Sequence, residues 1–128
     1  MRSSYTRIFA DDAGASHFED LDVELIPGFA VPPAEPLHVA PFMATSECSW
    51  VGFPHGRDGV AHPAPRRSLF VILQGEAEAT TGDGDRRRFG SGRVILLEDT
   101  WGTGHAAHIV SPDGIRSLVF TVQDQGGA

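Results

Sequence analysis

The chain has 128 residues, 41% of them hydrophobic and 21% charged, which are ordinary values for one globular domain. Its formal net charge of −7 argues against a nucleic-acid or anionic-membrane surface, because both need a basic footprint. We therefore expect neither nucleic acid nor membrane among its partners.

The single cysteine, Cys48, excludes an intrachain disulfide and favours a reducing compartment. No cation lies beside it in the sequence to activate the thiol, so we predict a buried structural cysteine. The first residues contain no apolar leader, and no stretch approaches 18 apolar residues. These features predict a cytoplasmic location.

Three regions are expected along the chain. Residues 1–18 are small and polar, and we expect an arm over the surface or over a partner subunit. Residues 19–122 are expected to form a barrel, and residues 123–128 a flexible tail.

The first half of the barrel region contains many prolines. Residues 22–26 alternate polar and apolar side chains, which predicts a short edge strand. Residues 27–41 carry five prolines and several apolar side chains, so we expect an extended segment that crosses a barrel wall. Residues 42–54 form the next strand region, with one face made by Glu47, Ser49, Val51 and Phe53 and the other by Cys48 and Trp50.

The second half reads as short apolar runs between glycine-rich turns. Strands are predicted at 68–73, 76–81, 93–97, 105–110 and 115–122. Short strands at this spacing are typical of an all-β sandwich or barrel.

Two histidines lie in or at the end of loops next to these predicted strands. His62 follows a proline-rich loop and leads into the run 68–73, which ends at Gly75. His105 follows the strand at 93–97 and the loop Gly102-Thr103-Gly104. The two segments resemble the two sequence motifs of the cupin superfamily, whose fold is a small jelly-roll barrel.

The similarity covers roughly residues 5–122 and is closest to small bacterial single-domain cupins. Segments 16–20, 62–67 and 97–100 also look like that subgroup. The resemblance implies an all-β cupin double-stranded β-helix. It does not imply one activity, because cupins include isomerases, cyclases, dioxygenases and non-catalytic binding proteins.

The metal motif is degenerate. A complete cupin site offers three histidines and one glutamate to a divalent metal, whereas Ala64 and Ser68 stand at two of those places here. His62 and His105 remain as the metal ligands if a metal is bound, with Glu47, His55 or His108 as further possibilities. On a flat strand His108 faces the opposite side from His105. The cofactor is thus left open between a divalent metal and none.

Without a metal, His62 and His105 are the candidate catalytic residues, because an imidazole can donate or accept a proton near neutral pH. The purely structural alternative is that each only satisfies loop backbone groups. The candidate substrate-binding residues are Arg66, Ser68, Phe70 and Trp101. For Trp101 we weigh two positions: the mouth of a pocket, or a place packed under a loop. Arg66 pairs a ligand carboxylate or an acidic neighbour.

Glu98 and Asp99 follow the strand at 93–97 as an acidic pair. Adjacent residues on a strand point apart, so we interpret this pair as structural rather than as an acid–base couple.

Together these features favour a small-molecule enzyme acting on a hydrophobic metabolite by metal-independent isomerisation, cyclisation or proton transfer. The resemblance would fit a tailoring step in secondary metabolism. The alternatives are a metal-dependent cupin dioxygenase or isomerase that uses His62 and His105, and a non-catalytic binding or regulatory cupin. A homodimer is expected, because small cupins often pair through strand exchange and the predicted arm offers an edge.

Overall fold

A computed structural model describes residues 1–56 and 59–123, and these residues form β-strands and no helix. No membrane-spanning helix therefore occurs among them. The strands are β1 (Arg2–Ala10), β2 (Ser16–Glu24), β3 (Ile26–Phe29), β4 (Leu37–Val39), β5 (Thr45–Phe53), β6 (Ser68–Gln74), β7 (Ala77–Thr80), β8 (Arg86–Phe89), β9 (Val94–Leu97), β10 (Ala106–Ile109) and β11 (Ile115–Val122).

Two sheets enclose the interior of the barrel. The larger sheet has the strand order β2-β1-β9-β6-β11-β5, and the smaller has the order β10-β7-β8. The β1–β9 pair is parallel and the other neighbours are antiparallel. The predicted all-β fold class is confirmed over the described residues, and the predicted strands in the second half lie within two residues of the observed ones.

The hydrophobic core lies between these sheets. The larger sheet contributes Ile8, Ile72, Ile95 and Ile115, and the smaller contributes Phe89 and Ile109. Because side chains alternate across a strand, every second residue of these apolar runs reaches the interior. The continuous runs of β6 and β9 also cover a second, smaller cluster that contains Leu69 and Leu96.

The N-terminal segment differs from its prediction. Residues 2–10 form a full strand, β1, paired with β2 on one side and β9 on the other, rather than an arm over the surface. Thr6 and Ile8 are almost completely buried. No alternation of polar and apolar residues marks this strand in the sequence, because its buried face includes the polar residue Thr6. The homodimer stays a prediction, but the free arm that partly motivated it is absent.

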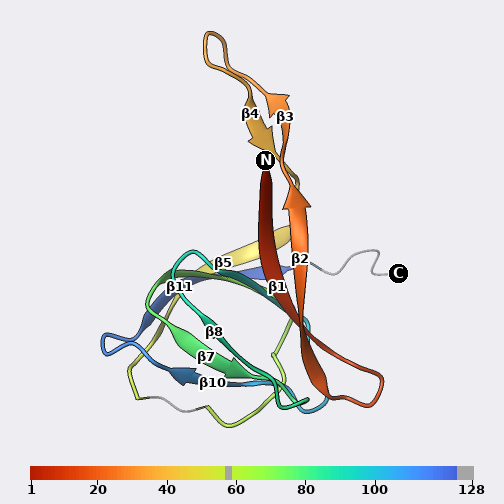
Figure 1. The fold of residues 1–128 in the computed structure, drawn as a ribbon, viewed down its shortest axis with the longest axis vertical. Helices are drawn as coiled ribbons and strands as arrows, with labels where there is room; N and C mark the ends of the chain where they lie inside the picture. The colour runs from red at the N-terminus through yellow and green to blue at the C-terminus, as the bar shows by residue number, and fades with distance from the viewer. Residues whose placement is uncertain (57–58, 124–128) are drawn as a thin grey trace.

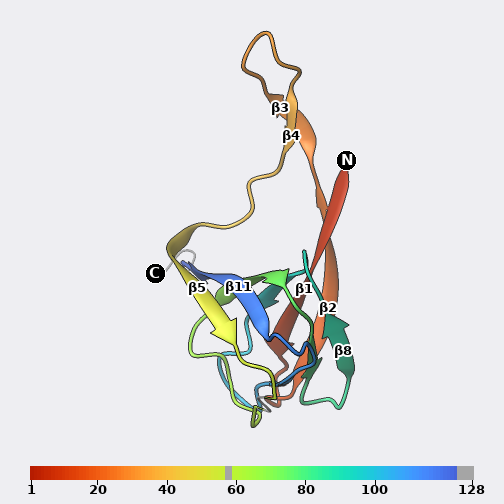
Figure 2. The ribbon, with the colours of Figure 1, turned by 90° about the vertical axis from the view of Figure 1, so that its left-hand side faces the viewer.

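Residues 27–41 also differ from their prediction. Strands β3 and β4 pair as a hairpin that projects away from the barrel (Figures 1 and 2), so this segment does not cross a barrel wall. Ile26 and Leu37 on the hairpin are each 58% exposed. Of the edge strand expected at 22–26, residues 22–24 end the longer strand β2, which does lie at the edge of the larger sheet, and Ile26 begins β3.

Strand β5 forms the opposite edge of the larger sheet. Cys48 on this strand is exposed, so the prediction of a buried thiol is wrong. The residues predicted to share a face, Glu47, Ser49, Val51 and Phe53, all face the barrel interior, as described below. The predicted tail falls almost entirely on residues 124–128, which lie outside the described residues.

Candidate functional site

A cavity of about 410 Å³ lies in the barrel interior. Its wall is built from both sheets and from the loops that precede β6 and β10. The buried core residues named above also line it, so the core is a shell around a hollow rather than a filled centre. A cavity of this size and lining is typical of a small-molecule site.

His62 and His105 both line this cavity, and the backbone holds them side by side. Each residue donates its backbone amide to the backbone carbonyl oxygen of the other at 3.2 Å, forming an isolated antiparallel bridge. The two imidazole ring centroids are 6.3 Å apart. The two motif histidines therefore meet across the loop ends, as expected for one site.

Gly104 makes this approach possible. Its backbone has a φ of +69°, and a Cβ at this position would lie 1.9 Å from the carbonyl carbon of His62. A side chain there would displace the His62 backbone, because no real Cβ contact is that short. Glycine at 104 is thus required for the spacing of the two histidines.

Asp99 holds His105 in place from behind. The carboxylate Oδ2 lies 2.6 Å from Nδ1 of His105, and the Asp99 side chain is 0% exposed. The backbone carbonyl of Asp99 accepts a hydrogen bond from the amide of Ala64 at 2.9 Å, which ties the loop after β9 to the loop before β6. Asp99 was interpreted from sequence as a structural residue, and its contact with His105 is the site feature that sequence reasoning missed.

These hydrogen bonds fix the tautomers of both rings. The Asp99 carboxylate accepts, so Nδ1 of His105 carries the proton and donates it. Nδ1 of His62 lies 2.9 Å from the carbonyl oxygen of Pro63, which can also only accept. In the neutral form each imidazole therefore keeps Nε2 unprotonated and able to take a proton.

The second oxygen of Asp99, Oδ1, is buried without a hydrogen-bond partner among the described residues. A buried carboxylate is costly unless a charged donor stabilises it. The neighbouring imidazole becomes such a donor when it gains a proton at Nε2. The pair therefore places a buried carboxylate directly behind the imidazole at the cavity wall.

The residues present do not fit the metal centre that the cupin resemblance implies. Metal sites in proteins usually supply three or four ligands. The places of two such ligands hold Ala64, which is buried, and Ser68, whose hydroxyl donates to the backbone of Arg66. Residues 1–56 and 59–123 contain no group of three or more histidine, cysteine, aspartate or glutamate side chains arranged to hold a metal ion.

Three of the four predicted substrate-binding residues line the cavity: Arg66, Ser68 and Phe70. Trp101 is not among the lining residues, is 52% exposed and lies against Gly14 in the loop between β1 and β2. Of the two positions predicted for Trp101, the structure therefore has the one in which the side chain packs against a loop. It moves the indole away from the cavity wall.

The other residues weighed as metal ligands separate in the structure. Glu47 lines the cavity, whereas His55 bonds through Nδ1 to the backbone carbonyl of Ser111 at 2.9 Å. His108 is exposed and lies between two cavity-lining residues, Ala107 and Ile109. It therefore faces away from His105, as strand geometry predicts.

Glu98 has a different environment from its neighbour Asp99. Its carboxylate lies 3.1 Å from Arg7 and 2.8 Å from Arg67. Glu98 thus joins β1 to the start of β6 and faces away from the histidines. The structural interpretation of the acidic pair therefore applies to Glu98 alone. Arg67 forms its ion pair with Glu98 and not with a ligand.

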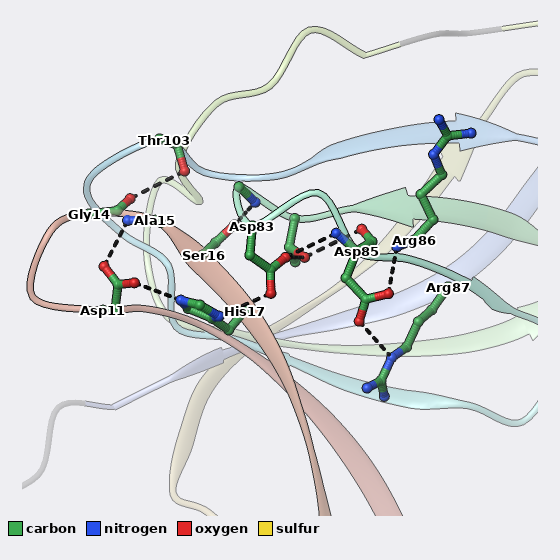
Figure 3. A network of polar contacts seen from close by, with 12 residues as sticks. Asp11, Gly14, Ala15, Ser16, His17, Asp83, Asp85, Arg86, Arg87 and Thr103 are labelled. Carbon is green, nitrogen blue, oxygen red and sulfur yellow. Dashed lines mark hydrogen bonds and ion pairs between the residues drawn. The ribbon is translucent and has the colours of Figure 1, made fainter.

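His17 lies in a separate polar network, between the loops at 11–15 and 81–85 (Figure 3). Its Nε2 is 2.6 Å from Asp11 and its Nδ1 is 3.0 Å from Asp83. The hydrogen bond with Asp11 is the main cause that raises the pKa of His17 above its ordinary value. The pKa of Asp11 is lowered by the same bond, and the pKa of Asp83 chiefly by the Thr81 hydroxyl. This histidine joins two loops outside the cavity.

Comparison with known proteins finds similarity among solved structures. No protein-family model matches the chain, and no curated protein does. A conserved Streptococcus pyogenes protein of unknown function is 23% identical over 62% of this chain, with a TM-score of 0.47. The match spans 65% of that protein, slightly less than two thirds of its length.

Proteins described as cupins are among the other similar structures. A Methanocaldococcus jannaschii RmlC-like cupin family protein with a double-stranded β-helix fold is 15% identical over 59% of this chain and 67% of its own, with a TM-score of 0.49. The cupin domain of Schizosaccharomyces pombe Cnp3 is 18% identical over 84% of this chain and 74% of its own, also with a TM-score of 0.49. At these identities the likeness concerns the fold and not the activity. The described residues form an all-β barrel, and solved cupins are among the structures to which the chain is similar.

Proposed function

We propose that this protein is a small-molecule enzyme in which His105, oriented by Asp99, moves a proton on an apolar metabolite. The observation that carries the proposal is the 2.6 Å hydrogen bond between a fully buried carboxylate and an imidazole at the cavity wall. A histidine held in one tautomer by a buried carboxylate is suited to general acid–base catalysis. Isomerisation and cyclisation are the reaction types that such proton transfer serves.

The proposed step needs no other reactant. Nε2 of His105 takes a proton from a carbon next to a substrate carbonyl, which leaves an imidazolium and an enolate. Asp99 stabilises the imidazolium through Nδ1–H. The imidazolium then returns a proton to the enolate. Return to a different carbon isomerises the substrate, whereas return to the same carbon leaves the substrate unchanged. His62 lies across the backbone bridge from His105, and its Nε2 is also unprotonated in the neutral ring. Once Nε2 of His62 is protonated, it can donate a hydrogen bond to the substrate oxygen.

Deuterium exchange tests this proposal without knowledge of the product. The protein is incubated in heavy water with a set of apolar ketones and aldehydes, and mass spectrometry measures deuterium gained by each compound. The wild-type protein is expected to accelerate exchange for at least one compound. His105→Ala and Asp99→Asn are expected to lower that rate by a factor of about 10² to 10⁴, the usual contribution of a general base.

His38→Ala is the matched control, because His38 is exposed on the projecting hairpin and outside the cavity lining. It should leave exchange unchanged. Exchange that persists at the wild-type rate in folded His105→Ala would refute the proposal.

A non-catalytic binding protein is the second candidate, and the mainly apolar cavity wall favours it. It predicts tight binding of an apolar compound with no deuterium exchange in the wild-type protein. His105→Ala would then leave the biological phenotype intact, while substitutions that fill the cavity would abolish it.

A further inference from the structure

The cavity has a polar end and an apolar end. The strand register places Glu47, Thr121 and Ser68 in one cross-strand row on β5, β11 and β6, and all three line the cavity. Ser68 in turn pairs with Leu97, two residues before Asp99. The polar row therefore lies at the same end of the barrel as the His105–Asp99 pair.

The opposite end is closed by hydrocarbon. Further along the same strands the lining residues are Ile72 on β6 and Ile115 on β11, and the smaller sheet adds Phe89 and Ile109. These four side chains are between 2% and 4% exposed. At the polar end the side chains of Glu47 and Arg66 are 68% and 62% exposed. The cavity thus opens at its polar end, and buried hydrocarbon lines its apolar end.

Arg66 is the one arginine or lysine among the described residues that line the cavity. Its guanidinium lies 3.8 Å from the Glu47 carboxylate, beyond hydrogen-bond distance, in an ion pair that solvent reaches. Such a pair contributes little stability, so a ligand anion can replace Glu47 at low cost. Arg67, by contrast, is bound to Glu98 at 2.8 Å.

From this arrangement we infer that the ligand is an amphiphile with one anionic head group, a carboxylate, and an apolar body. The body lies in the closed end, and the carboxylate pairs with Arg66 at the mouth, beside His105. The formal charge of −7 repels anions in general, so affinity for a carboxylate requires a specific cation. This inference names the substrate class of the same cavity and so rests on the proposed function.

Calorimetric titration with three eight-carbon probes tests the head group: octanoate, 1-octanol and octylammonium. The wild-type protein is expected to bind octanoate at least tenfold more tightly than either other probe. Arg66→Gln should remove that tenfold advantage and leave the affinity for 1-octanol unchanged. The control is Arg88→Gln, an exposed arginine paired with Glu76 on the outside of the smaller sheet, which should change nothing.

A series from butanoate to decanoate tests the apolar end. Burial of each added methylene is expected to raise affinity about fourfold until the closed end is reached. Equal affinity for octanoate and 1-octanol in the wild-type protein would overturn the head-group assignment. Affinity that does not rise with chain length would overturn the assignment of the body.

The two proposals fail separately. If the protein binds octanoate but exchanges deuterium into no carbonyl compound, the proposed enzyme activity is wrong and the proposed ligand class stands. If the protein catalyses deuterium exchange but binds octanoate no more tightly than 1-octanol, the proposed ligand class is wrong and the proposed enzyme activity stands.

Discussion

Asp99 and His105 lie six residues apart, at the two ends of a glycine-rich loop, and are joined by a 2.6 Å hydrogen bond at the cavity wall. The loop returns on itself because Gly102 packs against Gly14 and Gly104 against His62, at positions where a Cβ would collide with backbone. One buried carboxylate, one oriented imidazole and one apolar cavity thus meet at a single place.

The first prediction concerns Gly104. Gly104→Ala should destabilise the protein by more than about 4 kcal/mol or prevent folding, because the new Cβ would collide with the His62 backbone. Gly92→Ala is the matched control: Gly92 also has a positive φ, of +85°, but open space where a Cβ would stand. It should cost only about 1–2 kcal/mol. Chemical denaturation measures both, and equal losses would contradict the close approach at Gly104.

The second prediction separates Glu98 from Asp99. Glu98→Gln should lower the free energy of unfolding by about 1–3 kcal/mol, because charge-assisted hydrogen bonds to Arg7 and Arg67 are weakened. Its deuterium-exchange activity should match the wild type, since Glu98 faces away from the histidines. Glu35→Gln, at an exposed position of the hairpin, is the control for loss of a negative charge. Loss of exchange in folded Glu98→Gln would show that the two acidic residues act together.

The third prediction concerns pH and the His17 network. The pKa of His17 is raised above its ordinary 6.5, so its contribution is complete below pH 6.5 and is lost as pH rises through the higher folded pKa. The pKa values of Asp11 and Asp83 are lowered below 3.8, so their contributions are present above pH 3.8 and are lost as pH falls through the folded values. The network should therefore stabilise the fold most between about pH 4 and 6.5.

Thermal unfolding of the wild type and His17→Gln checks this from pH 3 to 9. The difference in Tm should be largest in that window and decrease on both sides. His38→Gln, which alters an exposed histidine of the hairpin, should show a small difference that does not vary in this way. A difference between wild type and His17→Gln that is constant with pH would contradict the ion pairs of His17.

The local patterns of the sequence predict most of the second half of the fold. Strands β6, β9 and β11 follow from short apolar runs between glycines, because burial of such runs depends little on distant residues. The alternation of β5 likewise predicts which of its side chains share a face. It does not predict which face is inside, because Cys48 was expected to be buried and is exposed. Both motif histidines line the cavity, where the cupin resemblance expects them.

What the sequence did not reveal depends on contacts between distant segments. Strand β1 is held by a parallel pairing with β9, almost 90 residues away, and no local pattern encodes that partner. Residues 27–41 are apolar yet project from the barrel, against the usual link between hydrophobicity and burial. Glu98 and Asp99 do point apart, as strand geometry predicts, and only Asp99 reaches His105. The turn at Gly102 to Gly104, which returns the chain to Asp99, decides which of the two meets His105.

The tautomer of His105 tests the central claim most directly. Long-range proton–nitrogen NMR of ¹⁵N-labelled protein, at a pH where the ring is neutral, identifies the protonated nitrogen, with His105→Gln used to assign the signals. The account predicts a proton on Nδ1 toward Asp99 and an unprotonated Nε2. A proton on Nε2, or a mixture of tautomers like that of an unconstrained imidazole, would contradict it.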